Sequence, residues 1–384
     1  GNLSVYNTHN LYGLTEQIAT NHAIKQITGK RPFLLTRSSF LSTGRYSTKW
    51  SGDNVASWYS LKSSVVAMLD YNLFSIPMIG SDICGFIHDT TEELCARWIA
   101  LGAFYPFSRN HNGKDSKPQE LYLWDTVTEA AQKALAVRYQ LLPYYYTLFF
   151  NAHSEGTPVI QSLWMNFPND PQVRDIDQQF LVGSSVLVSP VTERGARSVK
   201  AYFPPGAWYE FSSKRVFVNN ADGVGVYKVL PSNITDHQVH IAGGVILPLQ
   251  QAAMTTTIGR KTPFTYLVAL SNQYEADGWL YWDDGEQMDL NHYLYLQMHA
   301  SYDVEAKMGK LTVNPVVNSW SDANSYTVGV VEILNPGGMA TPKIVTVNHR
   351  VLGREQWEYN HISGGITIHD LEVVLNHPLE VSWQ

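Results

Sequence analysis

Lys49-Trp50-Ser51-Gly52-Asp53-Asn54 and, further along the chain, Ser81-Asp82-Ile83-Cys84-Gly85-Phe86 share one arrangement. In each segment an aspartate stands beside glycine at the end of a short apolar or aromatic run. Glycine lets the backbone turn sharply, so the carboxylate can be presented at the mouth of a pocket. An aspartate in a plain Gly-Asp turn is the simpler alternative. The two segments therefore predict an acidic, sugar-type pocket in which Asp53 lacks an evident partner.

Helices and strands alternate over residues 1–170, which predicts a parallel sheet. The expected helices cover 15–28, 55–71 and 126–153, the last with a break near Pro143, and a further helix begins at 89. The expected strands cover 31–36, 74–80, 102–107 and 158–164. Polar segments follow the strands at 36–39, 80–82 and 107–111. Sites at the carboxyl ends of strands occur in (β/α)8 barrels and in open α/β sheets. Four strands cannot close an eight-stranded barrel, so a barrel here would lack half.

From residue 171 onward the pattern changes to short alternating apolar segments, which is typical of an all-β region. The segments lie at 185–191, 199–203, 227–230, 245–249, 267–271, 293–297, 327–334 and 343–347. Turn signals stand at Asp222-Gly223, Asp277-Gly278, Asp284-Gly285 and 336–338. We expect two β-sandwich domains, at 171–250 and 251–384, after the α/β domain.

Composition excludes two kinds of partner. The chain of 384 residues carries a net charge of −7 and no basic run, which argues against nucleic acid. No apolar stretch reaches the ~18 residues that a membrane span needs. Aromatic residues make up 12 %, with 11 Trp and 22 Tyr. Stacking on sugar rings and large β-sandwich cores both favour that content, and both remain open.

The two cysteines, Cys84 and Cys95, fit one small disulfide loop or two free core thiols. Glycosylation sequons occur at Asn2-Leu3-Ser4 and Asn233-Ile234-Thr235. With the cysteine pair, the sequons favour a secretory compartment. The chain starts at Gly1 without Met or a signal peptide, so we expect a protein processed from a longer precursor.

Several segments, in order and spacing, resemble family 31 of the glycoside hydrolases, the α-glucosidase family. They are 31–40, 44–54, 80–86, 92–98, 102–111 and 281–286, and the resemblance weakens over 291–384. It implies the C-terminal half of a (β/α)8 barrel, followed by a proximal and a distal β-sandwich. The implied reaction is retaining hydrolysis of a terminal α-glucosidic bond by two carboxylates.

The resemblance also implies roles for single residues. Asp53 matches the general acid/base, and Asp82 matches a carboxylate that accepts hydrogen bonds from glucose hydroxyls. The other matching residues are Arg37 beside the nucleophile, Arg109 as a brace of the pocket carboxylates, His111 as a ligand of sugar hydroxyls, and Trp50 and Phe86 as apolar walls. A lone His or Arg is more often a surface residue, and an aromatic side chain in a barrel is more often core.

The family implies further features of the chain. Cys84 and Cys95 match a disulfide of its secreted and lysosomal branch. The nucleophile motif, which ends Asp-Met-Asn-Glu, does not occur; 164–167 resembles it superficially and carries no acid. We therefore expect an N-terminal partner chain from the same precursor that carries the nucleophile. The acidic segment Asp283-Asp284-Gly285-Glu286 is a candidate calcium-binding loop, but it offers too few oxygen ligands for a full site. We therefore expect a hairpin turn there. We expect no metal and no cofactor.

The expected function is that of the C-terminal subunit of an exo-acting α-glucosidase, which cleaves maltose, malto-oligosaccharides and starch ends. α-Xylosidase, transglucosidase or glucan lyase activity, or a non-catalytic carbohydrate-binding role, are the alternatives. The expected location is secreted, cell-wall, vacuolar or lysosomal.

Overall fold

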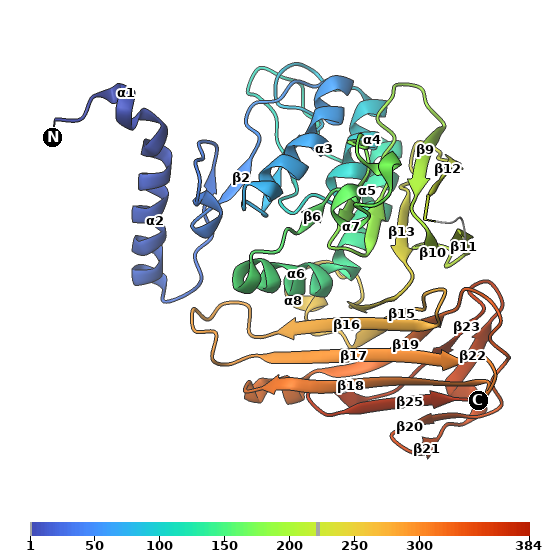
Figure 1. Cartoon of the computed structure of the whole chain (residues 1–384). Helices are drawn as coiled ribbons and strands as arrows, with labels where there is room; N and C mark the ends of the chain where they lie inside the picture. The colour runs from blue at the N-terminus through green and yellow to red at the C-terminus, as the bar shows by residue number, and fades with distance from the viewer. Residues whose placement is uncertain (1, 220–222) are drawn as a thin grey trace.

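The structure is a computed structural model that describes residues 2–219 and 223–384. The helices are α1 (Val5–Thr8), α2 (Tyr12–Thr28), α3 (Trp58–Leu73), α4 (Glu92–Gly102), α5 (Asp125–Gln140), α6 (Leu142–Glu155), α7 (Leu163–Asn166) and α8 (Thr256–Gly259). Figure 1 shows the α-helices, apart from the short α8, in the first half of the chain and a large sheet in the second. The turn expected at Asp222-Gly223 begins at a residue outside the described ranges.

The first part is half of a (β/α)8 barrel, as predicted. β1 (Leu35–Thr36), β2 (Thr48–Trp50) and β3 (Ile79–Gly80) form a parallel sheet in chain order. β4 (Asp82–Ile83) follows β3 directly and pairs in parallel with β5 (Arg109–Asn110). The strands have their carboxyl ends at one rim, which is the edge where the polar segments were expected.

One strand of this part was missed, and two strand predictions need correction. β2 was missed, because its buried residue Lys49 breaks the apolar pattern of a core strand. Residues 103–107 form turns after α4, and the strand comes later, at β5. The last expected strand is β6 (Ile160–Gln161), which pairs antiparallel with β7 (Phe180–Val182) and so leaves the parallel set.

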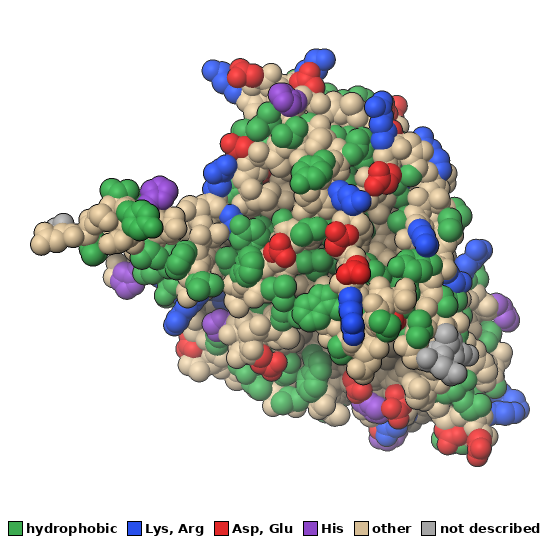
Figure 2. Space-filling view, turned by 45° about the horizontal axis from the view of Figure 1, so that its top comes forward, with side chains coloured by type: hydrophobic (Ala, Val, Ile, Leu, Met, Phe, Trp, Pro, Cys, Tyr) green, Lys and Arg blue, Asp and Glu red, His purple; other side chains and the backbone are tan. Residues whose placement is uncertain are grey.

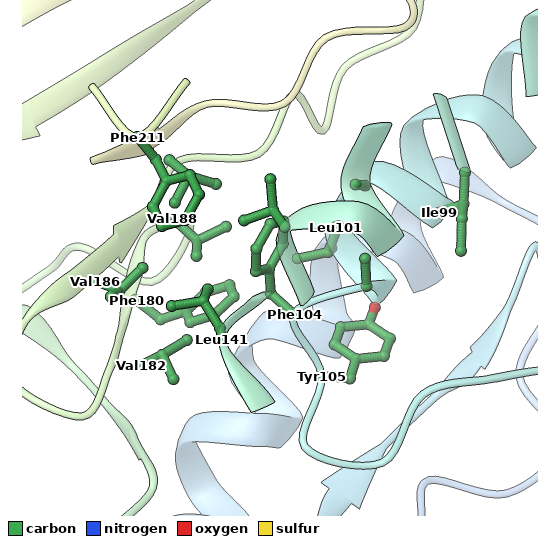
Figure 3. Packing of buried hydrophobic residues seen from close by; sticks show 14 of the residues in the cluster. Ile99, Leu101, Phe104, Tyr105, Leu141, Phe180, Val182, Val186, Val188 and Phe211 are labelled. Carbon is green, nitrogen blue, oxygen red and sulfur yellow. The ribbon is translucent and has the colours of Figure 1, made fainter. Parts of the chain in front are cut away.

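Helices α3 and α4 begin at side-chain caps and pack their buried residues against the half-barrel strands. Ser57 caps α3 by accepting from the Ser60 N–H, and Thr91 caps α4 by accepting from the Leu94 N–H. The break near Pro143 is the junction between α5 and α6, where proline occupies the first turn of α6. Figure 3 shows Phe104 next to Phe180 of β7, and the same buried cluster includes Val186 and Val188 of β8 (Val186–Val188). The barrel and the sheet that follows therefore share one core.

The next part is a six-stranded sheet with a two-stranded ribbon beside it. The sheet order is β11-β10-β13-β8-β7-β6, and the ribbon pairs β12 with β9. The remaining strands are β8 (Val186–Val188), β9 (Ser198–Phe203), β10 (Gly206–Glu210), β11 (Val216–Asn219), β12 (Val226–Pro231) and β13 (Val239–Ala242). Its inner aromatic cluster contains Tyr202, Phe203 and Trp208.

The last part is a twelve-stranded sheet around a second core. Its strands are β14 (Val245–Leu249), β15 (Phe264–Ala269), β16 (Glu275–Trp282), β17 (Leu294–Asp303), β18 (Met308–Asn318), β19 (Thr327–Leu334), β20 (Val345–Val347), β21 (Arg350–Val351), β22 (Trp357–Asn360), β23 (Gly365–Ile368), β24 (Val373–Val374) and β25 (Leu379–Trp383). The bounds expected for the three domains, 1–170, 171–250 and 251–384, stay predictions.

The turn expected at Asp277-Gly278 is wrong, because both residues lie inside β16. A Cβ on Gly278 would lie 2.3 Å from the carbonyl oxygen of Ile246 on β14. Position 278 needs glycine because strand β14 lies so close to it. The dipeptide Asp-Gly has the same sequence in a turn, so the sequence alone does not tell the two situations apart.

The N-terminal segment stands away from the body. α2 buries only Gln17 and Asn21 among its described residues, and Figure 2 shows the segment projecting with hydrophobic side chains on its surface. Among the described helices, none has the length and apolar character needed to cross a bilayer. In Figure 1, α2 lies on the side of the molecule next to the segment that carries β2.

Candidate active site

The predicted pocket residues lie together at the carboxyl-end rim of the half-barrel, where (β/α)8 barrels carry their sites. They are Arg37 after β1, Trp50 and Asp53 at and after the end of β2, Asp82 and Phe86 at and after β4, and Arg109 and His111 at and after β5. Parallel pairing sets this arrangement, since Asp82 is the ladder partner of Arg109.

Asp53 is an accessible carboxylate beside a cation. The preceding Gly52 has φ 85°, and a Cβ there would lie 2.7 Å from Nε of Arg37. Only glycine combines that conformation with that closeness. Nε of Arg37 lies 4.0 Å from Oδ1 of Asp53, with the side chains 64 % and 47 % exposed. A pair this exposed adds little stability, but it keeps a positive charge next to an acid that a ligand can reach.

Asp82 is held very differently. Its residue is fully buried, and Nη2 of Arg109 donates to its Oδ1 at 2.6 Å. Burial raises the pKa of Asp82, while Arg109 and His111 oppose the rise. Its Oδ2 has no partner within the described residues. A buried acceptor without a donor is costly, so Oδ2 of Asp82 is an unsatisfied acceptor at this rim.

We expect Arg109→Met to destabilise the assembled protein by about 3 kcal/mol at neutral pH, because it leaves a buried carboxylate without its cation. The loss of Arg109 raises the pKa of Asp82 further above its unfolded value. A carboxyl group of that kind is tolerated when protonated, so the deficit grows as pH rises from 4.5 to 7.5. Urea unfolding at both pH values measures it. Arg109→Met, Asp82→Asn is the matched control, and an equal pH dependence in both variants would contradict the assignment.

Aromatic rings wall the pocket. The guanidinium carbon of Arg109 lies 5.0 Å from the ring centre of Trp50 and 5.5 Å from that of Phe107. The rings of Phe86 and His111 lie 5.0 Å apart at 35°. Trp50 and Phe86 are partly buried and His111 is exposed, so these side chains are available at the pocket surface rather than sealed in the core.

Two amide side chains fix the loops of the rim, and the sequence did not single them out. Nδ2 of Asn54 donates to the Asp82 carbonyl at 3.0 Å, and its Oδ1 accepts from the Phe86 N–H at 3.0 Å. The buried Nε2 of Gln119 donates to the carbonyls of Ile83 and Gly85. Asn54 adjoins Asp53 in the decisive segment and could have been suspected. No local pattern marks Gln119.

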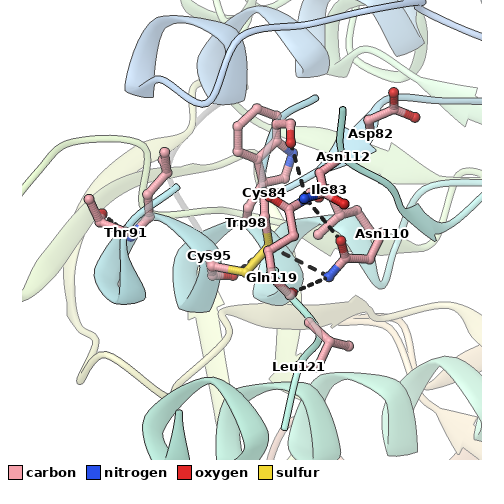
Figure 4. The surroundings of a disulfide bond; sticks show 12 residues. Asp82, Ile83, Cys84, Thr91, Cys95, Trp98, Asn110, Asn112, Gln119 and Leu121 are labelled. Atoms are coloured by element: carbon pink, nitrogen blue, oxygen red, sulfur yellow. Dashed lines mark hydrogen bonds between the residues drawn. A yellow bond between two sulfur atoms is a disulfide. The ribbon is translucent and has the colours of Figure 1, made fainter. Parts of the chain in front are cut away.

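The disulfide that the resemblance implied is present between Cys84 and Cys95. It ties the loop after β4 to α4, directly beside the Asn110–Gln119 hydrogen bonds (Figure 4). Cys84 and Gly85 have φ 73° and 93°, and a Cβ on Gly85 would lie 2.3 Å from Cα of Ala56. The loop that positions Asp82 and Phe86 is therefore tightly constrained.

Metal ligation has no candidate among the described residues, since no three His, Cys, Asp or Glu side chains cluster suitably. In the segment that invited a calcium reading, the Asp283 carboxylate is fully buried and accepts hydrogen bonds from Tyr146 and Tyr281. Its oxygens are thus occupied by protein donors. The adjacent Asp284 accepts from the N–H groups of Glu286 and Gln287 in a turn between β16 and β17.

Comparison with known proteins agrees with this geometry. Residues 1–148 match the TIM-barrel domain of glycosyl hydrolases family 31, and residues 156–247 match the family's C-terminal domain. The chain is 43 % identical to an alpha-glucosidase of Hordeum vulgare, across 91 % of this chain and 40 % of that one. It is 37 % identical to Alpha-xylosidase 1 of Arabidopsis thaliana, across 99 % of this chain and 43 % of that one.

A solved glucosidase II alpha subunit has the same fold, with a TM-score of 0.91 and 27 % identity over all of this chain and 43 % of that one. This chain thus spans about two fifths of each of these relatives. The two family models together cover most of residues 1–247, and the site geometry above agrees with them. The chain belongs to family 31 of the glycoside hydrolases.

Proposed function

We propose that the chain forms the acid/base half of a retaining exo-α-glucosidase. The observation that carries the proposal is the contrast between the two rim aspartates. Asp53 is open to a ligand, whereas Asp82 is buried, paired with Arg109 and raised in pKa. A retaining glycosidase needs an ionised nucleophile and a proton donor on the two sides of one bond. Asp82 is poorly suited to be that nucleophile, so we infer that the second carboxylate belongs to the rest of the protein.

In this mechanism, Asp53 donates its proton to the glycosidic oxygen as the bond to the leaving sugar breaks. The anomeric carbon becomes bonded to the nucleophile. Asp53, now a carboxylate, takes a proton from the incoming water, which releases the sugar with its original configuration. Arg37 supplies positive charge beside these acids. Oδ2 of Asp82 is buried and has no donor among the described residues, and we infer that a hydroxyl of the bound sugar becomes its donor.

The open half of the barrel supports a partner that carries the nucleophile. A cavity of about 880 Å³ is lined by residues at the starts of the half-barrel strands, among them Leu34, Thr48 and Met78, and by residues of α2 and α6. Apolar side chains nearby are exposed, including Phe33 at 63 % and Ile27 at 84 %. Exposed strand interiors and apolar patches are a liability in water. The first half of a barrel, on an N-terminal subunit or segment, would cover them.

The proposed substrates are maltose, malto-oligosaccharides and starch ends. The identity to the Hordeum alpha-glucosidase supports glucose as the sugar at the cleaved end. α-Xylosidase activity is the second candidate, because the Arabidopsis relative matches 99 % of the chain at 37 % identity. The described rim has no group whose contact distinguishes the hydroxymethyl arm of glucose from xylose. Transglucosidase, glucan lyase and non-catalytic binding are less well supported.

We propose a secretory location, in the cell wall, a vacuole or lysosome, or outside the cell. The Cys84–Cys95 disulfide persists in oxidising compartments. The sequon asparagines Asn2 and Asn233 are both exposed, so glycans at either position would point into solvent.

The decisive experiment co-expresses this chain with the N-terminal portion of its precursor. We expect the two to co-purify and to release α-glucose from maltose, while the chain by itself is inactive. Product configuration is read by NMR during the first minutes. Release of β-glucose, or turnover of xylosides in preference to maltose, would overturn the mechanism or the substrate respectively.

A further inference from the structure

Lys49 is an unusual residue for its position. It lies in the middle strand of the half-barrel sheet, where Thr36 and Ile79 are its ladder partners, and it is only 4 % exposed. Trp50 next to it faces the pocket, so Lys49 points to the opposite face, towards α3. Lysine is rarely buried in this way unless a carboxylate accompanies it. In the part of the chain that the structure describes, no carboxylate forms an ion pair with Lys49.

The ammonium instead has two other contacts. Nζ donates to the main-chain carbonyl of Arg37, and it lies 4.9 Å from the ring centre of Tyr71 on α3. Burial lowers the pKa of Lys49 to about 8, and the positive charge of Arg37 lowers it as well. Lys49 therefore stays charged at neutral pH at a cost that an apolar side chain such as methionine would avoid.

The contact falls on a residue that otherwise has little to hold it. Arg37 follows β1 directly, and its side chain is 64 % exposed. Its guanidinium must still pass within contact distance of Gly52 to lie beside Asp53. The hydrogen bond from Lys49 thus fixes the main chain at Arg37, the residue whose side chain extends into the pocket.

We propose that Lys49 is a positioning residue, whose buried ammonium holds the Arg37 main chain so that the Arg37 guanidinium stays beside Asp53. This rests on the proposed function of Asp53, and it adds an element that the rim residues do not include. The charged or titratable groups that face the ammonium are Arg37 from the segment after β1 and Tyr71 from α3; the neighbour from β3, Ile79, is apolar. Loss of the Lys49 proton above pH ~8 weakens the hold on Arg37.

The test compares Lys49→Met with Lys49→Arg in the assembled protein, with Lys214→Met as the matched control. Lys214 is also largely buried, but it lies 3.9 Å from Glu332 and remote from the rim. We expect Lys49→Met to lower kcat by about 10- to 100-fold with a small change in KM. Its thermal midpoint at pH 6 should equal or exceed that of the native protein, since a buried charge has been removed. Lys49→Arg should retain more kcat, and Lys214→Met should leave kcat unchanged.

Two further readouts separate positioning from support of the fold. The native kcat should fall as pH rises through about 8, and this fall should be absent in Lys49→Met. By hydrogen exchange, peptides covering 34–42 should exchange faster in Lys49→Met and not in Lys214→Met. Unchanged exchange at 34–42, or a lower thermal midpoint that accounts for the lost activity, would overturn the proposal. The exchange measurement tests the role of Lys49 even if the native protein cleaves no α-glucoside. That absence of activity would contradict the proposed function and not the role of Lys49.

Discussion

Asp53→Asn is expected to lower kcat/KM of the assembled protein for maltose by about 10²–10⁴-fold, the usual contribution of a general acid. Asparagine keeps the shape of the side chain and its place beside Arg37 but cannot give a proton to the glycosidic oxygen. Because Asp53 is 47 % exposed, the exchange should leave the thermal midpoint nearly unchanged. Initial rates of glucose release measure the effect.

The size of the loss should depend on the leaving group. An aryl glucoside with an acidic phenol leaves without protonation, so Asp53→Asn should impair its first step far less than that of maltose. Azide needs no general base, and it should rescue turnover as α-glucosyl azide. Asp175→Asn, at an exposed aspartate away from the rim, is the control. Intact maltase activity in Asp53→Asn would remove Asp53 from the catalytic role.

The clustering of the candidate residues at the rim was predictable because each of these side chains lies within a few positions of a strand end. Asp53 and Asp82 carry their own signal, an acid beside glycine after an apolar run. Parallel pairing then brings these strand ends together without any further sequence-specific information. The clustering at the rim follows from local motifs and one topological rule.

What escaped prediction depends on contacts between distant residues. β2 was missed because its central residue is Lys49, whose burial makes sense only beside the Arg37 carbonyl and the Tyr71 ring. β6 looked like a barrel strand, yet β7 pairs with it from the following sheet. The pattern of apolar residues predicts that a segment forms a strand, but it does not predict which other strand pairs with it.

Asp283 shows the same limit more sharply. In sequence it belongs to a hairpin or a weak calcium loop, and in the structure its side chain is fully buried. Its partners are Arg31, Tyr146 and Tyr281, the first two of which lie 252 and 137 positions away. The cluster joins the segment before β1, helix α6 and strand β16, so it connects the half-barrel to the last sheet.

Asp283→Ala is expected to destabilise the assembled protein by about 3–5 kcal/mol. The substitution leaves the partly buried Arg31 guanidinium and the hydroxyl groups of Tyr146 and Tyr281 without their acceptor. Tyr146 and Tyr281 donate to the carboxylate at 2.5 and 2.6 Å. Arg31 also donates from Nε to the carbonyl of Gln287 at 2.6 Å, so part of the junction between the half-barrel and the last sheet persists. Asp284→Ala, at the exposed neighbouring acid, should cost about 1 kcal/mol or less.

The pH dependence distinguishes lost ion pairing from a simple packing defect. Burial tends to raise the pKa of Asp283, but the hydrogen bonds from Tyr146, Tyr281 and Arg31 prevail and hold it below its ordinary value. A depressed carboxyl pKa contributes stability that is present above the unfolded pKa, near 4, and is lost as pH falls below it. The deficit of Asp283→Ala should therefore be constant from pH 5 to 7 and shrink towards pH 3 in urea unfolding. A deficit that stays the same down to pH 3 would mean that the cluster stabilises the junction by shape and not by charge.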